Sequence, residues 1–286
     1  MKRRNFLKLA GTAGTGFAFT PSFADDFFTG NKKIKNFGLQ LYTLRDDLPK
    51  DPSGVLKQVA AAGYKFIEPY TDAKLGMFCG MSNKEFKKFI GDLGMKMCSV
   101  HTDVFDNYEK KVEQLAEIGV EYIIYNWEGT NRTLDEYKGF CDKFNKMGEQ
   151  SKKQGVKFAF HNHDYTFKPL EGQIAQTILM DNTDPSLVYY EMDMYWVVTA
   201  GNDPVEWMKK YPNRFRLCHV KDRAKNTTEN FDSCTLGTGM IDYPTILAEA
   251  KKNGMDYFIV EQEKYAGTTP LQAIKDNADY MRGLTV

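Results

Sequence analysis

From residue 34 onward, two patterns of apolar residues alternate along the chain. Continuous apolar runs of about four to eight residues predict strands buried on both faces, and apolar residues at every third or fourth position predict amphipathic helices. Several helical stretches end at a glycine that directly precedes the next run, the usual helix C-cap. The predicted strands are 34–42, 64–69, 95–102, 120–127, 156–163, 186–196, 215–221 and 257–262, and the clearest predicted helices are 53–62, 83–93, 108–118, 134–154 and 243–253.

This alternation has no linker or low-complexity break, and it predicts an α/β protein with a single (β/α)8 TIM barrel, because eight strand–helix units in about 250 residues match the size of that fold. A doubly wound open sheet is the alternative. It would require a glycine-rich phosphate-binding turn after the first strand, and residues 39–45 contain no glycine. In a barrel the C-terminal ends of all strands meet at one face, where the active site lies.

Residues 1–24 differ from the rest of the chain. A basic start, Lys2-Arg3-Arg4, precedes a small and apolar run, and no acidic residue occurs before Asp25. This layout predicts a twin-arginine signal peptide and export to the periplasm; a frayed amphipathic amino terminus is the alternative. The apolar run is too short to span a bilayer, so no stable membrane insertion is expected. The predicted organisation is a signal peptide at 1–24, a linker at 25–33 and a catalytic barrel at 34–286.

Charge and cysteine content exclude several classes of protein. The whole chain has 38 basic and 38 acidic residues; without residues 1–24, which hold four basic residues, 34 and 38 remain, a formal charge of −4. This balance gives no electrostatic basis for binding nucleic acid. The five cysteines form no C-x-x-C pair, which argues against a zinc knuckle or a redox motif.

The candidate chemistry lies at the predicted strand ends. His161 and His163 are two residues apart on one strand and therefore point to the same side, and His101 and His219 also follow apolar runs. A ring of buried carboxylates and imidazoles is costly unless a cation neutralises it, which favours a divalent metal. Ion pairs with Arg45, Lys221 and Arg223 are the alternative. The strand ends carry Gln40 and Tyr42, Glu68, His101, Asn126 and Trp127, His161 and His163, Asp193 and Trp196, His219 and Lys221, and Glu261 and Glu263.

These motifs, in this order, resemble the xylose isomerase-like TIM barrels of the sugar phosphate isomerase/epimerase superfamily, in particular an exported subgroup with His-x-His on the fifth strand. The resemblance implies one divalent ion held by Asp193, His219 and Glu261. His161 occupies the position at which the superfamily usually has a glutamate, and it completes the predicted ligand set. The matching segments are 38–46 (GLQLYTLRD), 160–164 (FHNHD), 192–196 (MDMYW), 219–222 (HVKD) and 260–261 (VE).

This ligand set also predicts the kind of metal. Two carboxylates and two neutral imidazoles around a divalent ion leave the site neutral, whereas three carboxylates would leave it at −1. Two nitrogen ligands favour manganese, cobalt, zinc or nickel over magnesium.

The remaining residues receive predicted roles in proton transfer and substrate binding. We expect His163 and Lys221 to move protons, with Glu261 as a third participant, because histidine titrates near neutrality and a cation lowers the pKa of a neighbouring lysine. Trp127 and Trp196 could equally be packing residues, and the loop 236–242 reads either as a phosphate cradle or as turn glycines before a helix cap. The predicted substrate-binding residues are Tyr42, Glu68, His101, Trp127, Trp196 and Arg223.

The resulting functional prediction is an isomerase, epimerase or lyase that acts on an unphosphorylated keto-sugar through an enediolate intermediate. Export and the lack of a convincing phosphate cradle favour an unphosphorylated substrate. A 3-keto-glycoside is attractive because its carbonyl acidifies the proton at carbon 2, and the aglycone at carbon 1 can leave by β-elimination; a free ketose is a close second. The alternatives are a non-catalytic carbohydrate-binding barrel and an endonuclease for damaged DNA. Oligomeric state is open.

Overall fold

The computed structural model of the protein describes residues 33–286. The predicted signal peptide and all of the predicted linker except Lys33 lie outside the described residues. Ile34 N donates to Leu284 O at 3.1 Å, so the described amino end pairs with the end of the chain. No helix within residues 33–286 combines the length and the apolarity needed to cross a bilayer.

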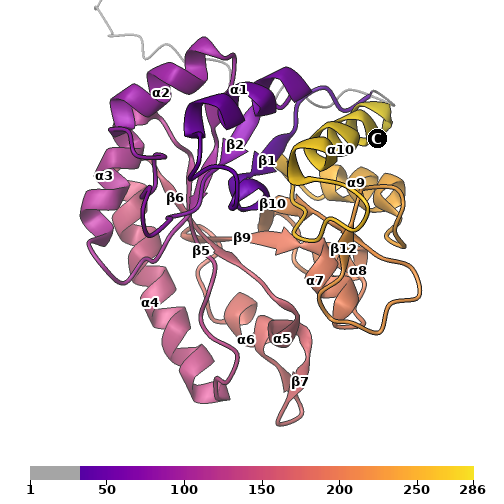
Figure 1. The fold of residues 1–286 in the computed structure, drawn as a ribbon. Helices are drawn as coiled ribbons and strands as arrows, with labels where there is room; N and C mark the ends of the chain where they lie inside the picture. Colours follow the sequence, from indigo (N-terminus) through magenta and orange to yellow (C-terminus); the bar gives the residue numbers. More distant parts are fainter. Residues whose placement is uncertain (1–32) are drawn as a thin grey trace, which may run out of the picture.

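The strands form a parallel barrel surrounded by helices (Figure 1). Its strands are joined in the order β3-β2-β1-β13-β10-β9-β6-β5-β4. Only Cys98 separates β3 from β4, so these two are halves of one strand and the sheet closes on itself as the predicted (β/α)8 barrel. The strands are β1 (Gly38–Gln40), β2 (Phe66–Glu68), β3 (Lys96–Met97), β4 (Ser99–His101), β5 (Tyr122–Tyr125), β6 (Lys157–His161), β9 (Val188–Asp193), β10 (Phe215–Val220) and β13 (Tyr257–Val260).

The five predicted helices are confirmed to within one residue at each end. The predicted strand 186–196 is too long, because Asp193 accepts a hydrogen bond from Trp196 N at 3.2 Å and thereby caps a helix that begins at Met194. The remaining elements are the turn η1 (Leu41–Leu44), the helices α1 (Pro52–Ala62), α2 (Asn83–Asp92), α3 (Tyr108–Ile118), α4 (Leu134–Lys153), α5 (Asp164–Phe167), α6 (Ala175–Asp181), α7 (Met194–Thr199), α8 (Pro204–Lys210), α9 (Tyr243–Lys252) and α10 (Pro270–Gly283), and the short strands β7 (Pro169–Leu170), β8 (Gln173–Ile174), β11 (Asp222–Arg223) and β12 (Ser233–Cys234).

Strand β6 shows how the barrel aims its histidines. Phe158 and Phe160 are fully buried and pack on Phe144 of α4. Their ring centroids lie 5.1 Å and 5.3 Å, respectively, from that of Phe144. Side chains alternate along a strand, so Ala159 and His161 point to the barrel interior. The apolar run therefore fixes both the helix that covers β6 and the direction of His161.

Helix α4 contains two glycines with different surroundings, which permits a matched stability test. A Cβ at Gly148 would lie 2.4 Å from the Leu187 backbone oxygen, whereas Gly139 has nothing within 4 Å. We expect Gly148→Ala to lower the free energy of unfolding by about 1–3 kcal/mol, the usual cost of overpacking. Gly139→Ala should raise it by up to about 1 kcal/mol through helix propensity. Urea denaturation measures both, and equal stabilisation by the two changes would contradict the close packing at Gly148.

Candidate metal centre and active site

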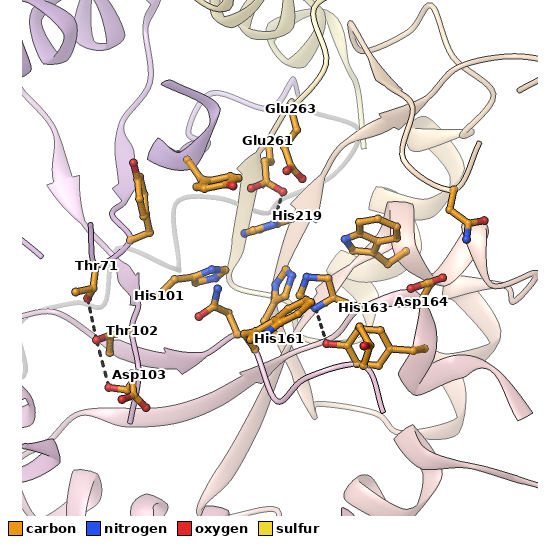
Figure 2. A pocket seen from close by; sticks show the side chains of 18 residues that line it. Thr71, His101, Thr102, Asp103, His161, His163, Asp164, His219, Glu261 and Glu263 are labelled. Atoms are coloured by element: carbon orange, nitrogen blue, oxygen red, sulfur yellow. Dashed lines mark hydrogen bonds and ion pairs between the residues drawn. The ribbon is translucent and has the colours of Figure 1, made fainter. Parts of the chain in front are cut away.

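A cavity of about 550 Å³ opens at the C-terminal ends of the strands, where barrel enzymes carry their active sites (Figure 2). The predicted ring of residues at the strand ends accounts for much of its wall. Predicted site residues that line it are Tyr42, His101, Trp127, His161, His163, Trp196, His219 and Glu261. The other lining residues are Tyr70, Thr71, Thr102, Asp103, Asn126, Thr130, Asp164, Tyr165, Asn230 and Glu263.

Three predicted metal ligands meet at the floor of the cavity. His219 Nδ1 lies 3.2 Å from Glu261 Oε2 and 3.7 Å from Asp193 Oδ2, and His161 Nε2 lies 3.9 Å from the same Asp193 oxygen. Ligand atoms about 2.0–2.2 Å from one ion lie roughly 3–4 Å from each other. Asp193 Oδ2 is buried and has no hydrogen-bond partner. Asp193, His219, Glu261 and His161, here called the outer group, therefore fit a divalent cation. Within this group the contact of His161 is the one to Asp193.

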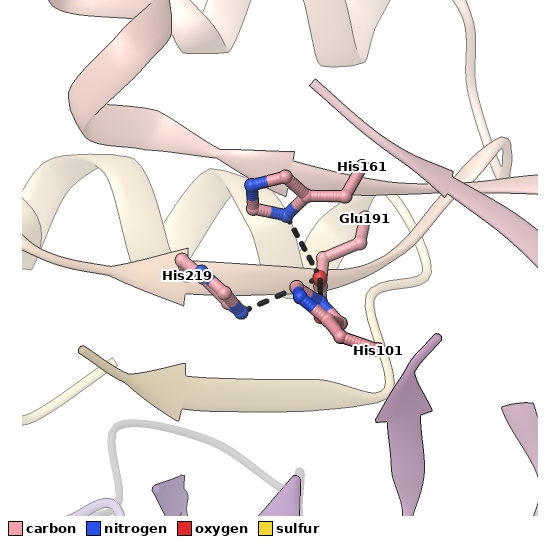
Figure 3. Close-up of side chains that lie close together, drawn as sticks. All are labelled: His101, His161, Glu191 and His219. Carbon is pink, nitrogen blue, oxygen red and sulfur yellow. Dashed lines mark hydrogen bonds and ion pairs between the residues drawn. The ribbon is translucent and has the colours of Figure 1, made fainter. Parts of the chain in front are cut away.

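A second cluster lies deeper, and sequence reasoning missed its central residue. Glu191 Oε2 lies 2.6 Å from His101 Nε2, 2.9 Å from His161 Nδ1 and 3.3 Å from His219 Nε2 (Figure 3). Glu68 Oε1 lies 2.8 Å from His219 Nε2 and 3.2 Å from His101 Nε2. Glu68, His101 and Glu191 are here called the inner group. Donor atoms of His101, His161, Glu191 and His219 all lie within 4.8 Å of one another, so this set could also hold a metal.

A spacing signal for Glu191 was present in the sequence. Glu191 and Asp193 are two residues apart on β9, the same spacing as His161 and His163, of which His161 ends the neighbouring strand β6 and His163 lies just beyond it. In the sheet, His161 pairs directly with Glu191. Glu191 was not predicted, because it lies two residues before the end of β9 and the prediction considered only residues at strand ends.

The inner group has strongly shifted proton affinities. Burial lowers the pKa of His101, but the carboxylates of Glu68 and Glu191 outweigh burial and raise it to about 9. Burial and the nearby Glu68 raise the pKa of Glu191 to about 7. Burial, with His219 and His101 nearby, holds the pKa of His161 well below its usual value. His161 is therefore neutral in the protein without a bound cation. Its ring contacts Glu191 of the inner group and Asp193 of the outer group.

Lys221, a predicted base, is surrounded by carboxylates that favour its charged form. It is fully buried, its Nζ lies 3.3 Å from Glu261 Oε2 and 3.9 Å from Asp193 Oδ2, and it also binds Glu263. Burial alone would lower the lysine pKa, but these carboxylates raise it in the protein without a bound cation. The ammonium also lies 5.0 Å from the ring centroid of Trp196. Lys221 is thus a fixed positive charge beneath the cavity.

His163 lies in the cavity wall among aromatic rings. Its imidazole stacks on Tyr165 at 5.5 Å and meets Trp127 edge-on at 5.2 Å and Trp196 at 5.7 Å. Burial lowers the pKa of His163 to about 4, so it does not titrate near neutrality as predicted. It is neutral at pH 7 and can accept a proton from a substrate in the cavity.

Two predicted substrate-binding residues are placed elsewhere. Glu68 is fully buried beneath the histidines, where it accepts hydrogen bonds from Gln40 Nε2 at 2.8 Å and from Ser99 Oγ. Arg223 does not line the cavity; its guanidinium donates to Tyr195 Oη and Asn230 O, both at 3.2 Å, and so fixes the loop after β11.

The loop 236–242 is a turn before a helix and not a phosphate cradle. The Asp222 carboxylate accepts hydrogen bonds from the backbone N–H groups of Gly237 at 2.9 Å, Gly239 at 3.0 Å and Ile241 at 3.1 Å. The side chain of Asp242 caps α9. These amides are occupied by a protein carboxylate, so they do not form an anion site.

Comparisons with known proteins agree with this fold. A family model described as xylose isomerase-like TIM barrel matches residues 56–284. Inosose dehydratase from Clostridium perfringens (strain ATCC 13124) is 32% identical over 145 residues, which cover 46% of this chain and 48% of the relative. The chain thus spans about half the length of this curated relative.

Two solved structures extend the comparison to nearly the whole barrel. A sugar phosphate isomerase/epimerase from Parabacteroides distasonis superposes with a TM-score of 0.73 at 31% identity, covering 86% of this chain and 97% of the other. A 3-keto-D-glucoside 4-epimerase from E. coli shares the fold, with a TM-score of 0.65 at 17% identity over 87% of this chain and 99% of the other. Because the family model matches well over half of the sequence and the barrel is present in the structure, the chain belongs to the xylose isomerase-like TIM barrel family.

Proposed function

We propose that the protein is a divalent-metal-dependent enzyme that removes a proton next to the carbonyl of an unphosphorylated keto-sugar, and that a 3-keto-glycoside is its substrate. One observation carries this proposal. The cavity has carboxylates and imidazoles suited to a cation at its floor and tryptophans in its wall, and its described lining residues include no lysine or arginine.

The charge of the cavity argues against a phosphorylated substrate. Carboxylates of Asp103, Asp164, Glu261 and Glu263 line it, and Glu261 and Glu263 are already paired with the buried Lys221. The described lining residues include no lysine or arginine that could bind a phosphate dianion. An uncharged sugar needs no such partner, and its apolar ring faces can contact Trp127, which is 54% exposed.

The protein's residues divide into three roles. Asp193, His219, Glu261 and His161 would hold the cation, which when bound acts as a Lewis acid toward the sugar carbonyl. The four-ligand set contains two imidazoles, which favours manganese, cobalt, zinc or nickel over magnesium. His163 is neutral and accepts the proton from the neighbouring carbon. Lys221 stays charged and holds Glu261 in place.

The fate of the substrate after proton removal decides the reaction class. Return of the proton gives an isomer or epimer, and loss of a substituent on the next carbon gives elimination. The names of two similar proteins, an inosose dehydratase and a 3-keto-D-glucoside 4-epimerase, support chemistry that begins beside a ring carbonyl. In a 3-keto-glycoside the aglycone at carbon 1 is placed to leave, so we favour the lyase.

We also propose that the enzyme works outside the cytoplasm, on the basis of the signal-like layout of residues 1–24. Mass spectrometry of protein recovered from the periplasm should give an amino terminus at Asp25. Periplasmic protein that retains Met1 would contradict cleavage.

The function is tested with manganese-loaded protein in deuterated water, followed by NMR. Substrates are a methyl 3-keto-glucoside, a free ketose and a sugar phosphate, with chelator-treated protein as control. We expect methanol release, or deuterium exchange at carbon 2, only with the keto-glucoside. His163→Gln should lower turnover at least about 100-fold while leaving metal content unchanged, because general-base catalysis contributes about 10²–10⁴-fold. Activity confined to the sugar phosphate would overturn the proposal, and sugar binding without exchange would indicate a carbohydrate-binding barrel.

A further inference from the structure

We propose that Glu191 and Glu68 are positioning residues that fix opposite tautomers in two metal-binding histidines. The rings of His161 and His219 each have one nitrogen toward the carboxylates of the outer group and the other toward the carboxylates of the inner group. The inference rests on the proposed cation site, but it does not depend on the substrate.

Distances distinguish the two groups. Contacts between histidine nitrogens and carboxylate oxygens in the inner group measure 2.6, 2.8, 2.9, 3.2 and 3.3 Å, largely within the range of hydrogen bonds. Those in the outer group measure 3.2, 3.7 and 3.9 Å, and two of them are too long for hydrogen bonds. The inner carboxylates therefore accept protons from the rings, and the outer group leaves room for an ion.

This division assigns the ring protons. His161 donates its Nδ1–H to Glu191 Oε2, which leaves the Nε2 lone pair facing Asp193. His219 donates its Nε2–H to Glu68 Oε1 at 2.8 Å, so Nδ1, which faces Asp193 and Glu261, is the nitrogen that would give up its proton and bind the ion. His161 and His219 would therefore bind the ion through different nitrogens. They lie on β6 and β10, the two strands on either side of β9, which carries Asp193.

The inner group is itself held in place. Glu68 accepts hydrogen bonds from Gln40 and Ser99, so its carboxylate cannot rotate away from His219. His101 Nε2 lies 2.6 Å from Glu191 and 3.2 Å from Glu68 and thereby joins the two carboxylates. Carboxylates behind metal-binding histidines orient the ring and raise ligand basicity, and their loss typically weakens metal binding about 10–100-fold.

Nitrogen-15 NMR of histidine-labelled protein tests the assignment without sugar, in metal-free and Zn²⁺-loaded protein. In both forms we expect His161 to be protonated at Nδ1 and not at Nε2. In the metal-free form His219 should carry protons on both nitrogens because, although burial lowers its pKa, Glu191 and Glu261 raise it well above the usual value. With Zn²⁺ bound, His219 should lose the proton on Nδ1 and keep the one on Nε2. Glu191→Gln should disturb the pattern of His161, and Glu68→Gln that of His219, because an amide can donate as well as accept. Each change should raise the Kd for Mn²⁺ about 10–100-fold while leaving one ion per chain at saturation.

A matched control is Glu128→Gln, because Glu128 is 1% exposed and its carboxylate oxygens accept no hydrogen bond from these histidines. It should leave both the histidine signals and the Mn²⁺ affinity unchanged. Equal affinities in all three variants, the same tautomer in both rings, or two Mn²⁺ ions per wild-type chain would overturn the inference. A failure of wild-type protein to bind Mn²⁺ would instead remove the proposed cation site, while the tautomer of His161 remains measurable.

Discussion

Replacing Asp193 with alanine or asparagine is expected to abolish stoichiometric binding of a divalent metal and to lower turnover by about 10³-fold or more. Asp193 Oδ2 faces both imidazoles of the outer group, at 3.9 Å from His161 Nε2 and 3.7 Å from His219 Nδ1. Lewis-acid stabilisation of the transition state is worth several kcal/mol, and each 1.36 kcal/mol changes the rate tenfold. Metal analysis after dialysis and the exchange assay measure the two effects.

The pair of substitutions separates metal binding from folding. Asp193 also caps α7 through Trp196 N, so alanine should additionally cost about 1 kcal/mol of stability, whereas the asparagine oxygen can keep this bond. Asp203→Ala removes the corresponding cap of α8, where Asp203 accepts from Val205 N at 2.8 Å, and serves as the control. It should lose similar stability with full metal content. Stoichiometric metal in Asp193→Asn would locate the cation elsewhere.

Replacing Lys221 with methionine is expected to lower the free energy of unfolding by about 3–5 kcal/mol in chelator-treated protein. The substitution leaves the buried Glu261 and the partly buried Glu263 without their common cation, and removal of one partner of a buried pair has this cost. Divalent metal should restore much of the loss, because it supplies positive charge at the same place and binds only the folded state.

The same variant discriminates between two roles of Lys221. Removal of a positive charge 3.3 Å from Glu261 Oε2 should increase the affinity for Mn²⁺, which titration calorimetry measures. If Lys221 were the catalytic base, the variant would lose turnover with little change in stability or metal affinity. Unchanged stability in chelator-treated protein would contradict the counter-charge role.

The fold could be predicted closely from the sequence because its signals are local. Periodicity located every barrel strand, and glycine caps located the helix ends to within one residue. The outer group could also be predicted, because Asp193, His219 and Glu261 lie at or beside strand ends that the barrel brings together.

The inner group and several roles could not be predicted, because they depend on contacts across the barrel. The register that pairs Glu191 with His161 is not visible in either strand alone. Arg223 was predicted to bind substrate, but the loop after β11 folds back, and the guanidinium of Arg223 donates a hydrogen bond to Asn230 O. The pKa of Lys221 rises because three carboxylates from two other strand ends surround it, which spacing along the chain does not reveal.

The placement of the tryptophans gives the protein an optical property. Of the three tryptophans in the sequence, Trp127 and Trp196 line the cavity, whereas Trp207 is buried against Phe167 with ring centroids 4.8 Å apart. A sugar that displaces water from the cavity changes the surroundings of two emitters and leaves the third unaffected. Tryptophan emission should therefore report occupancy of the cavity without a label, and Trp207 adds a constant background to the same spectrum.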